Sequence, residues 1–132
     1  MPRSASAKSR FATGMSTRRA VLGDDYVSKA VKTASAFDAD FQRFITEGAW
    51  GSVWSRPGLT KRERSLITIA LLAAGGHDHE LTFHVRATRN TGATPDDVKE
   101  ALLHVAVYAG VPAANRAFRV AKKALQDMDG ER

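Results

Sequence analysis

His84 and Glu80 are the pair of residues whose types and spacing best suit chemistry. They lie four positions apart in a segment with helical periodicity, so their side chains share one helix face. An imidazole titrates near neutral pH and can act as a general acid, and a nearby carboxylate can orient the ring or keep it protonated. Taken by themselves, such residues are more commonly a structural histidine beside a solvated glutamate.

Arginine and tryptophan side chains suggest a second kind of site, one for an organic anion. A guanidinium matches a carboxylate bidentately, and the candidates are Arg56, Arg64 and Arg86. Each of these three also fits a surface ion pair, which is the interpretation we favour for Arg62 and Arg89. Trp50 and Trp54 could wall a pocket, although such large rings more often belong to the core or to a subunit interface.

The histidines and the lack of cysteine bear on metal and redox chemistry. With no cysteine in the chain, disulfides, thiolate zinc sites and thiol catalysis are excluded. His77, His79 and His84 make a weak zinc signal, because positions i and i+2 face apart on a helix and no carboxylate has the proper spacing. We therefore predict no metal site, and we interpret His79 and His104 as exposed or structural.

Helical periodicity runs through the chain from Asp24 onward, and no alternating pattern long enough for a strand interrupts it. A core face is expected on Phe37, Phe41 and Phe44, followed by a loop over 51–58. Thr60 and Thr94 are expected to cap helix starts. The predicted fold is all-α, a single compact domain of about six helices over residues 24–34, 37–50, 60–74, 78–92, 94–109 and 113–128.

The charge of +6 is concentrated at the start of the 132-residue chain. Residues 1–23 contain five Lys and Arg and no acid, whereas residues 24–132 contain 15 basic and 14 acidic residues. We expect residues 1–23 to be a flexible basic tail without an apolar face for docking, and residues 24–132 to form the helical domain. Nucleic-acid binding through the tail is an alternative, although we expect no nucleic-acid or membrane partner and a cytoplasmic location.

Five segments together resemble the carboxymuconolactone decarboxylase family over nearly everything after the tail. They are Arg18–Asp24, Ala49–Leu59, Arg64–Ala70, His84–Ala87 with Asn90 and Gly92, and Gly110–Asn115. In related alkylhydroperoxidase D-like reductases, a glutamate, two cysteines and a histidine form the site. Those positions fall here on Ser65, His77, Glu80 and His84. Of the four reductase site residues, this chain has only the histidine. The resemblance therefore points to the decarboxylase branch and away from thiol redox chemistry.

The resemblance implies a cofactor-free carboxy-lyase that converts 4-carboxymuconolactone to 3-oxoadipate enol-lactone in protocatechuate catabolism. It implies His84 as proton donor with Glu80 beside it, and a homo-oligomer whose usual form is a hexamer. The candidates for binding the carboxylates and ring of such a substrate are Arg56, Arg64, Arg86, Trp50, Trp54, Ser65 and His77. A lyase acting on another lactone or keto acid, or a non-catalytic nucleic-acid-binding protein, remains open at this point.

Overall fold

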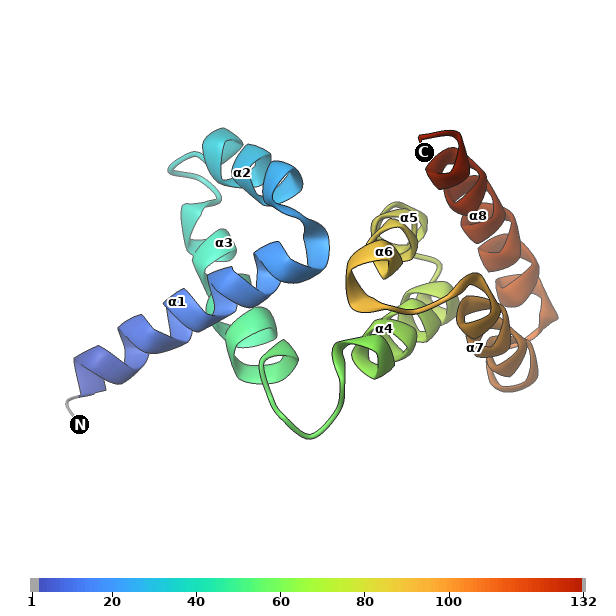
Figure 1. The fold of residues 1–132 in the computed structure, drawn as a ribbon, viewed down its shortest axis with the longest axis horizontal. Coiled ribbons are helices and arrows are strands. Elements are labelled where there is room, and N and C mark those ends of the chain that lie inside the picture. Colours follow the sequence, from blue (N-terminus) through green and yellow to red (C-terminus); the bar gives the residue numbers. More distant parts are fainter. Residues whose placement is uncertain (1–2, 132) are drawn as a thin grey trace. The chain divides into compact units, whose positions relative to one another are not determined.

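The computed structural model describes residues 3–131, and all the regular structure in this range is helical. It comprises eight α-helices and one π-helix, which confirms the all-α fold. The chain divides into two compact units, with the boundary after Leu59 (Figure 1). Between residues 3 and 131, no helix is both long and apolar enough to cross a bilayer.

The first unit is built around a long contact between its first and last helices. Its elements are α1 (Arg3–Leu22), α2 (Asp24–Thr33), α3 (Ala39–Ile45) and the π-helix η1 (Thr46–Trp54). Helix α1 packs along η1, and the chain turns into α2 at Gly23, whose φ of 94° favours glycine. Val21 and Val27 are fully buried where α1 and α2 meet.

Two glycines allow the close crossing of α1 and η1. A Cβ atom built on Gly14 would lie 2.1 Å from the carbonyl oxygen of Thr46, and one built on Gly51 would lie 2.7 Å from the carbonyl oxygen of Arg10. Both contacts are with backbone atoms, which cannot move aside as a flexible side chain can. Any side chain at either position would therefore separate the two helices.

Residues 1–23 were expected to form a flexible basic tail without an apolar face for docking. Residues 1 and 2 lie outside the described residues; from Arg3 to Leu22 the segment forms α1, whose last turns bury Val21 and Arg18. Phe11 and Met15 precede Arg18 at i, i+4 and i+7, so the three share a face. Because one of these three positions is an arginine, a search for regularly spaced hydrophobic residues does not detect this helix face.

The segment expected to be a helix over 37–50 is helical from Ala39, but its expected aromatic core face is wrong. The segment instead begins with a turn, continues as α3 and becomes π-helical at Thr46, and the expected loop starts only after Trp54. Phe37 is 98% exposed, and Phe41 and Phe44 are mostly exposed as well. Phe37 precedes the helix, and the 3.6-residue periodicity of α3 aligns Phe41 and Phe44 on one face without ensuring that another element covers that face.

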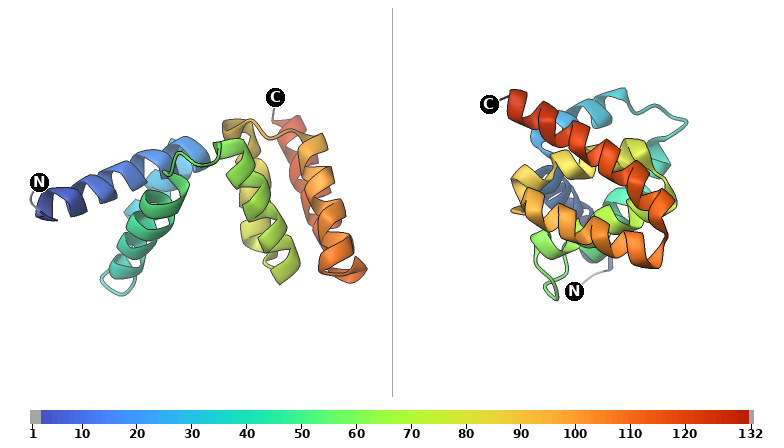
Figure 2. Two further views of the ribbon diagram at one scale, coloured as in Figure 1. Left: turned by 90° about the horizontal axis from the view of Figure 1, so that it is seen from below. Right: turned by 90° about the vertical axis from the view of Figure 1, so that its right-hand side faces the viewer.

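The second unit consists of five helices whose starts follow the sequence closely. They are α4 (Lys61–Gly75), α5 (Asp78–Arg86), α6 (Thr88–Thr91), α7 (Pro95–Tyr108) and α8 (Val111–Gly130). Thr60 forms the predicted capping box with Glu63, and Thr94 forms one with Asp97. Helices α7 and α8 lie side by side in both views of Figure 2.

Small residues on α8 permit that close packing. Ala114, Ala117, Ala121 and Ala124 recur at intervals of three and four and are all buried. They pack with Ile69 of α4, Leu81 and Val85 of α5 and Leu102 of α7, which form the core of this unit. Helix α5 is thus held by its two buried residues, and the side chains beside them are placed at the edge of the core.

Candidate active site

His84 lies on α5 next to the buried Val85 and is itself half-buried, whereas Glu80, one turn earlier, is exposed. Burial lowers the pKa of His84 below its ordinary value of 6.5, and the negative charge of Glu80 acts in the opposite direction. In the isolated chain His84 is therefore mainly neutral at neutral pH. It can accept a proton there, or donate one once a further negative charge approaches it.

Helix α4 packs against α5 and carries two more of the candidates. Arg64 is half-buried, and Ser65 is fully buried. The hydroxyl of Ser65 has no hydrogen-bond partner among the described residues. His77 is exposed and precedes the first residue of α5, so it lies at the entrance to that helix.

Arg86 is occupied by a protein carboxylate in this structure. Its guanidinium donates two hydrogen bonds to Glu131, one of them at 2.5 Å to Oε2, and lowers the pKa of that carboxyl group. Arg86 would have to exchange Glu131 for a substrate carboxylate. Arg62 pairs bidentately with Asp97 at 2.6 and 2.8 Å, and Arg89 lies 3.5 Å from Glu131, so both predicted surface ion pairs are confirmed.

The candidates of the first unit lie at its C-terminal end. Trp50 and Trp54 are both buried in η1 and stack with ring centroids 5.1 Å apart. Arg56 follows the end of η1 in a turn and is exposed. The tryptophans therefore serve as core of this unit, and Arg56 is the member of the group that solvent reaches.

The other histidines lie where the sequence placed them. His79 is exposed and contacts the edge of Phe83, with ring centroids 4.4 Å apart, and His104 is exposed and stacks on Tyr108. Across residues 3–131, no three His, Cys, Asp or Glu side chains come together in a way that could hold a metal ion.

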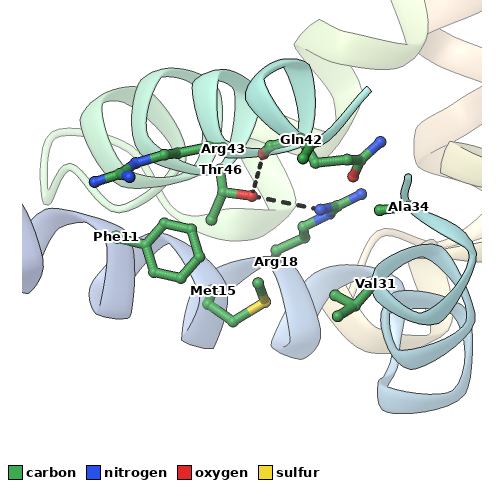
Figure 3. A pocket seen from close by; sticks show the side chains of 9 residues that line it. Phe11, Met15, Arg18, Val31, Ala34, Gln42, Arg43 and Thr46 are labelled. Atoms are coloured by element: carbon green, nitrogen blue, oxygen red, sulfur yellow. Dashed lines mark hydrogen bonds between the residues drawn. The ribbon is translucent and has the colours of Figure 1, made fainter. Parts of the chain in front are cut away.

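A cavity in the first unit involves a residue that sequence reasoning missed. It has a volume of about 480 Å³ and lies among α1, the end of α2, α3 and the start of η1 (Figure 3). Arg18 projects into it from α1 beside Phe11 and Met15, opposite Gln42 and Thr46. The available signal was the position of this arginine on an apolar helix face.

Comparison with known proteins identifies the family. The sequence model of the carboxymuconolactone decarboxylase family matches residues 39–123, which is more than half of the chain. The chain belongs to this family. The match covers every candidate on α4 and α5 as well as Trp50, Trp54 and Arg56, but it begins after α1 and α2.

Two relatives match over most of their length. A 4-carboxymuconolactone decarboxylase of Acinetobacter baylyi is 45% identical over 119 residues, which cover 90% of this chain and 89% of the relative. A nitrosuccinic acid decarboxylase of Metarhizium robertsii is 42% identical over 118 residues, which cover 89% of this chain and 82% of the relative. Both names describe decarboxylases, and this member of the family is accordingly an enzyme of the carboxy-lyase class.

Proposed function

We propose that this enzyme decarboxylates 4-carboxymuconolactone to 3-oxoadipate enol-lactone without a cofactor. The observation that carries the proposal is the 45% identity, over 90% of the chain, to a decarboxylase named for that substrate. We further propose that it acts in protocatechuate catabolism, in the cytoplasm and as a homo-oligomer.

The substrate itself can accept the electrons that decarboxylation releases. Its ring carbon bears both a carboxylate and a carboxymethyl arm, and a C=C bond conjugates that carbon with the lactone carbonyl. When the bond to the carboxylate breaks, carbon dioxide leaves, and the electron pair passes through the alkene to the lactone oxygen as a dienolate. Protonation of the carbon next to the carbonyl then gives the enol-lactone, so no bound electron sink is required.

Within this scheme the protein has to orient the carboxylates, stabilise the oxyanion and deliver one proton. We assign the delivery of the proton to His84. Burial lowers the pKa of its imidazole, and the negative charge of the bound substrate would raise that pKa again, so that the ring takes up a proton when the substrate binds. Glu80 is assigned to support the protonated ring. The candidates for orienting the substrate are Arg56, Arg64, Arg86, Ser65 and His77. Trp50 and Trp54 are assigned to support the wall of the substrate pocket.

Nitrosuccinic acid is the second candidate substrate, because the relative named for it is 42% identical over 89% of the chain. It is a succinic acid with a nitro group, so one of its carbons bears a nitro group, a carboxylate and a carboxymethyl arm. A nitro group accepts a carbanion's electron pair much as the conjugated lactone does. The two candidate substrates therefore share one pattern: a carboxylate and a carboxymethyl arm on a carbon attached to an electron sink.

The test is to supply purified enzyme with each compound at several concentrations and to measure carbon dioxide release. We expect kcat/KM for the lactone to exceed that for nitrosuccinate by at least about tenfold, a difference of about 1.4 kcal/mol in transition-state stabilisation. The reverse order would transfer the assignment to nitrosuccinate. Turnover of neither compound would contradict the proposal.

A further inference from the structure

Arg18 is a buried cation without a counter-ion. Its residue is 4% exposed, and across residues 3–131 no carboxylate lies within ion-pair distance of it. Its Nε has no hydrogen-bond partner, and its remaining hydrogen bond is a long one, 3.4 Å from Nη1 to the hydroxyl oxygen of Thr46. Desolvation lowers the pKa of the guanidinium, which shows that the surroundings disfavour its charge. Burying an unpaired charge destabilises a fold, so its retention calls for a reason.

The cavity beside Arg18 suits an organic anion. Its volume of about 480 Å³ falls within the ~300–1,000 Å³ typical of small-molecule sites. Phe11, Met15 and Val31 supply an apolar wall. Gln42 also lines the cavity, and its buried Oε1 is an acceptor without a partner, so it could receive a hydrogen bond from a donor group of a ligand but not from the carboxylate. The second arginine of the lining, Arg43, is already paired with Glu47 at 3.3 Å, so the unmatched charge belongs to Arg18.

We propose that the Arg18 cavity binds the carboxymethyl arm of the substrate, with the guanidinium of Arg18 paired to the carboxylate of that arm. This inference rests on the proposed function for the identity of the substrate. It makes Arg18 a substrate-binding residue on a helix outside the part of the chain that the family model matches.

The nature of decarboxylation decides which of the two carboxylates Arg18 holds. The leaving carboxylate becomes neutral carbon dioxide, so its charge moves away toward the electron sink. A cation paired with it would stabilise the ground state more than the transition state and slow the reaction. The carboxymethyl group keeps its charge from substrate to product. A desolvated guanidinium can therefore hold that group tightly without opposing the chemistry.

The experiment compares Arg18→Gln with Arg19→Gln in the full-length protein. Arg19 is the adjacent cation, is only partly buried and pairs with Asp24, so its replacement removes the same charge outside the cavity. The probe is 2-furanacetic acid, a ring with a carboxymethyl arm, and binding is measured by calorimetry. Its amide serves as the uncharged control, and 2-furoic acid, with a carboxylate directly on the ring, imitates the leaving group.

We expect Arg18→Gln to raise the Kd of 2-furanacetate, and the KM of the lactone substrate, by about 10- to 100-fold, the usual effect of losing a charged hydrogen bond. The kcat should fall by less than about tenfold, because the contact persists through the reaction. Arg19→Gln should change neither constant by more than about threefold. Unchanged Kd and KM in Arg18→Gln would overturn the proposal, as would a stronger dependence on Arg18 for 2-furoate than for 2-furanacetate.

Thermal melting separates binding from a structural role. Without ligand, Arg18→Met should melt at the same or a higher temperature than the wild type, because it removes an uncompensated buried charge. A lower melting temperature together with unchanged probe affinity would show that Arg18 is structural. If the wild type does not turn over 4-carboxymuconolactone yet binds 2-furanacetate through Arg18, the proposed function fails while the carboxymethyl site stands.

Discussion

The half-buried position of His84 makes the pH dependence of catalysis a test of its role. Burial lowers its pKa below 6.5 in the free enzyme, so the imidazolium forms only on the acid side of that value. If the protonated ring is required, kcat/KM should fall as pH rises through this lowered pKa. The fall in kcat should occur at higher pH, because a bound dianionic substrate raises the pKa of the histidine. Initial rates between pH 5 and 8 measure both profiles.

Replacing His84 with glutamine removes the proton donor but keeps a side chain that can form hydrogen bonds. We expect kcat to fall by roughly 10²- to 10⁴-fold, with little change in KM or melting temperature. Glu80→Gln is the matched comparison on the same helix; it should reduce the rate less and lower the pKa seen in the pH profile, since the Glu80 charge raises the pKa of His84. A His84→Gln enzyme that is less stable but turns over normally per folded chain would assign this histidine to the core.

At the scale of elements, the crossing of α1 and η1 depends on Gly14. We expect Gly14→Ala to destabilise the protein by about 1–3 kcal/mol, because its Cβ would overlap the Thr46 carbonyl oxygen. Gly48→Ala is the control within η1, where a Cβ would meet no atom within 4 Å, and it should be neutral or stabilising by up to about 1 kcal/mol. Urea unfolding measures both variants. Equal effects would show that the crossing tolerates a side chain.

The ion pair between Arg62 and Asp97 joins the first turns of α4 and α7. The hydrogen bonds from Arg62 contribute most to lowering the pKa of Asp97 from 3.8 to about 2. The resulting stability is present above pH 3.8 and is lost as the pH falls toward 2. We expect Arg62→Gln to lower the unfolding free energy at pH 7 and to flatten its decline between pH 4 and 2. Lys61→Gln, which removes the neighbouring exposed cation, should leave that slope intact.

The parts of the fold that the sequence predicted are those governed by local rules. Thr60 and Thr94 identified two helix starts because capping depends on residues within one turn. The predicted burial of Phe37, Phe41 and Phe44 is wrong because burial depends on partners outside the local sequence and because the helix begins only at Ala39, after Phe37. For the site, periodicity placed His84 and Glu80 on one helix, but the isolation of Arg18 from any carboxylate became visible only in three dimensions.

At the scale of the whole molecule, the apolar side chains left exposed support the proposed oligomer. In the second unit, Leu71 of α4 and Val107 of α7 are 67% and 74% exposed, and the aromatic side chains near α3 are exposed in the first. Such surfaces usually mark association sites. We expect sedimentation to show an oligomer for the wild type and smaller species for Leu71→Lys and Val107→Lys. Gln126→Lys, which adds the same charge at an exposed polar position of α8, should sediment as the wild type.

The π-helical form of η1 also bears on how this family can change. A π-helix can arise when an α-helix accepts one inserted residue, and removal of one residue between 47 and 49 would allow α-helical bonding to return. The part of the helix before the deletion would then turn by about 100° relative to the part after it. Thr46 would move away from Arg18 while the tryptophans kept their places. The loss of a single codon could thus change the lining of the Arg18 cavity, and the orientation of a ligand bound there, without altering the fold. Relatives that differ in length at this point are therefore the ones in which to look for a different substrate.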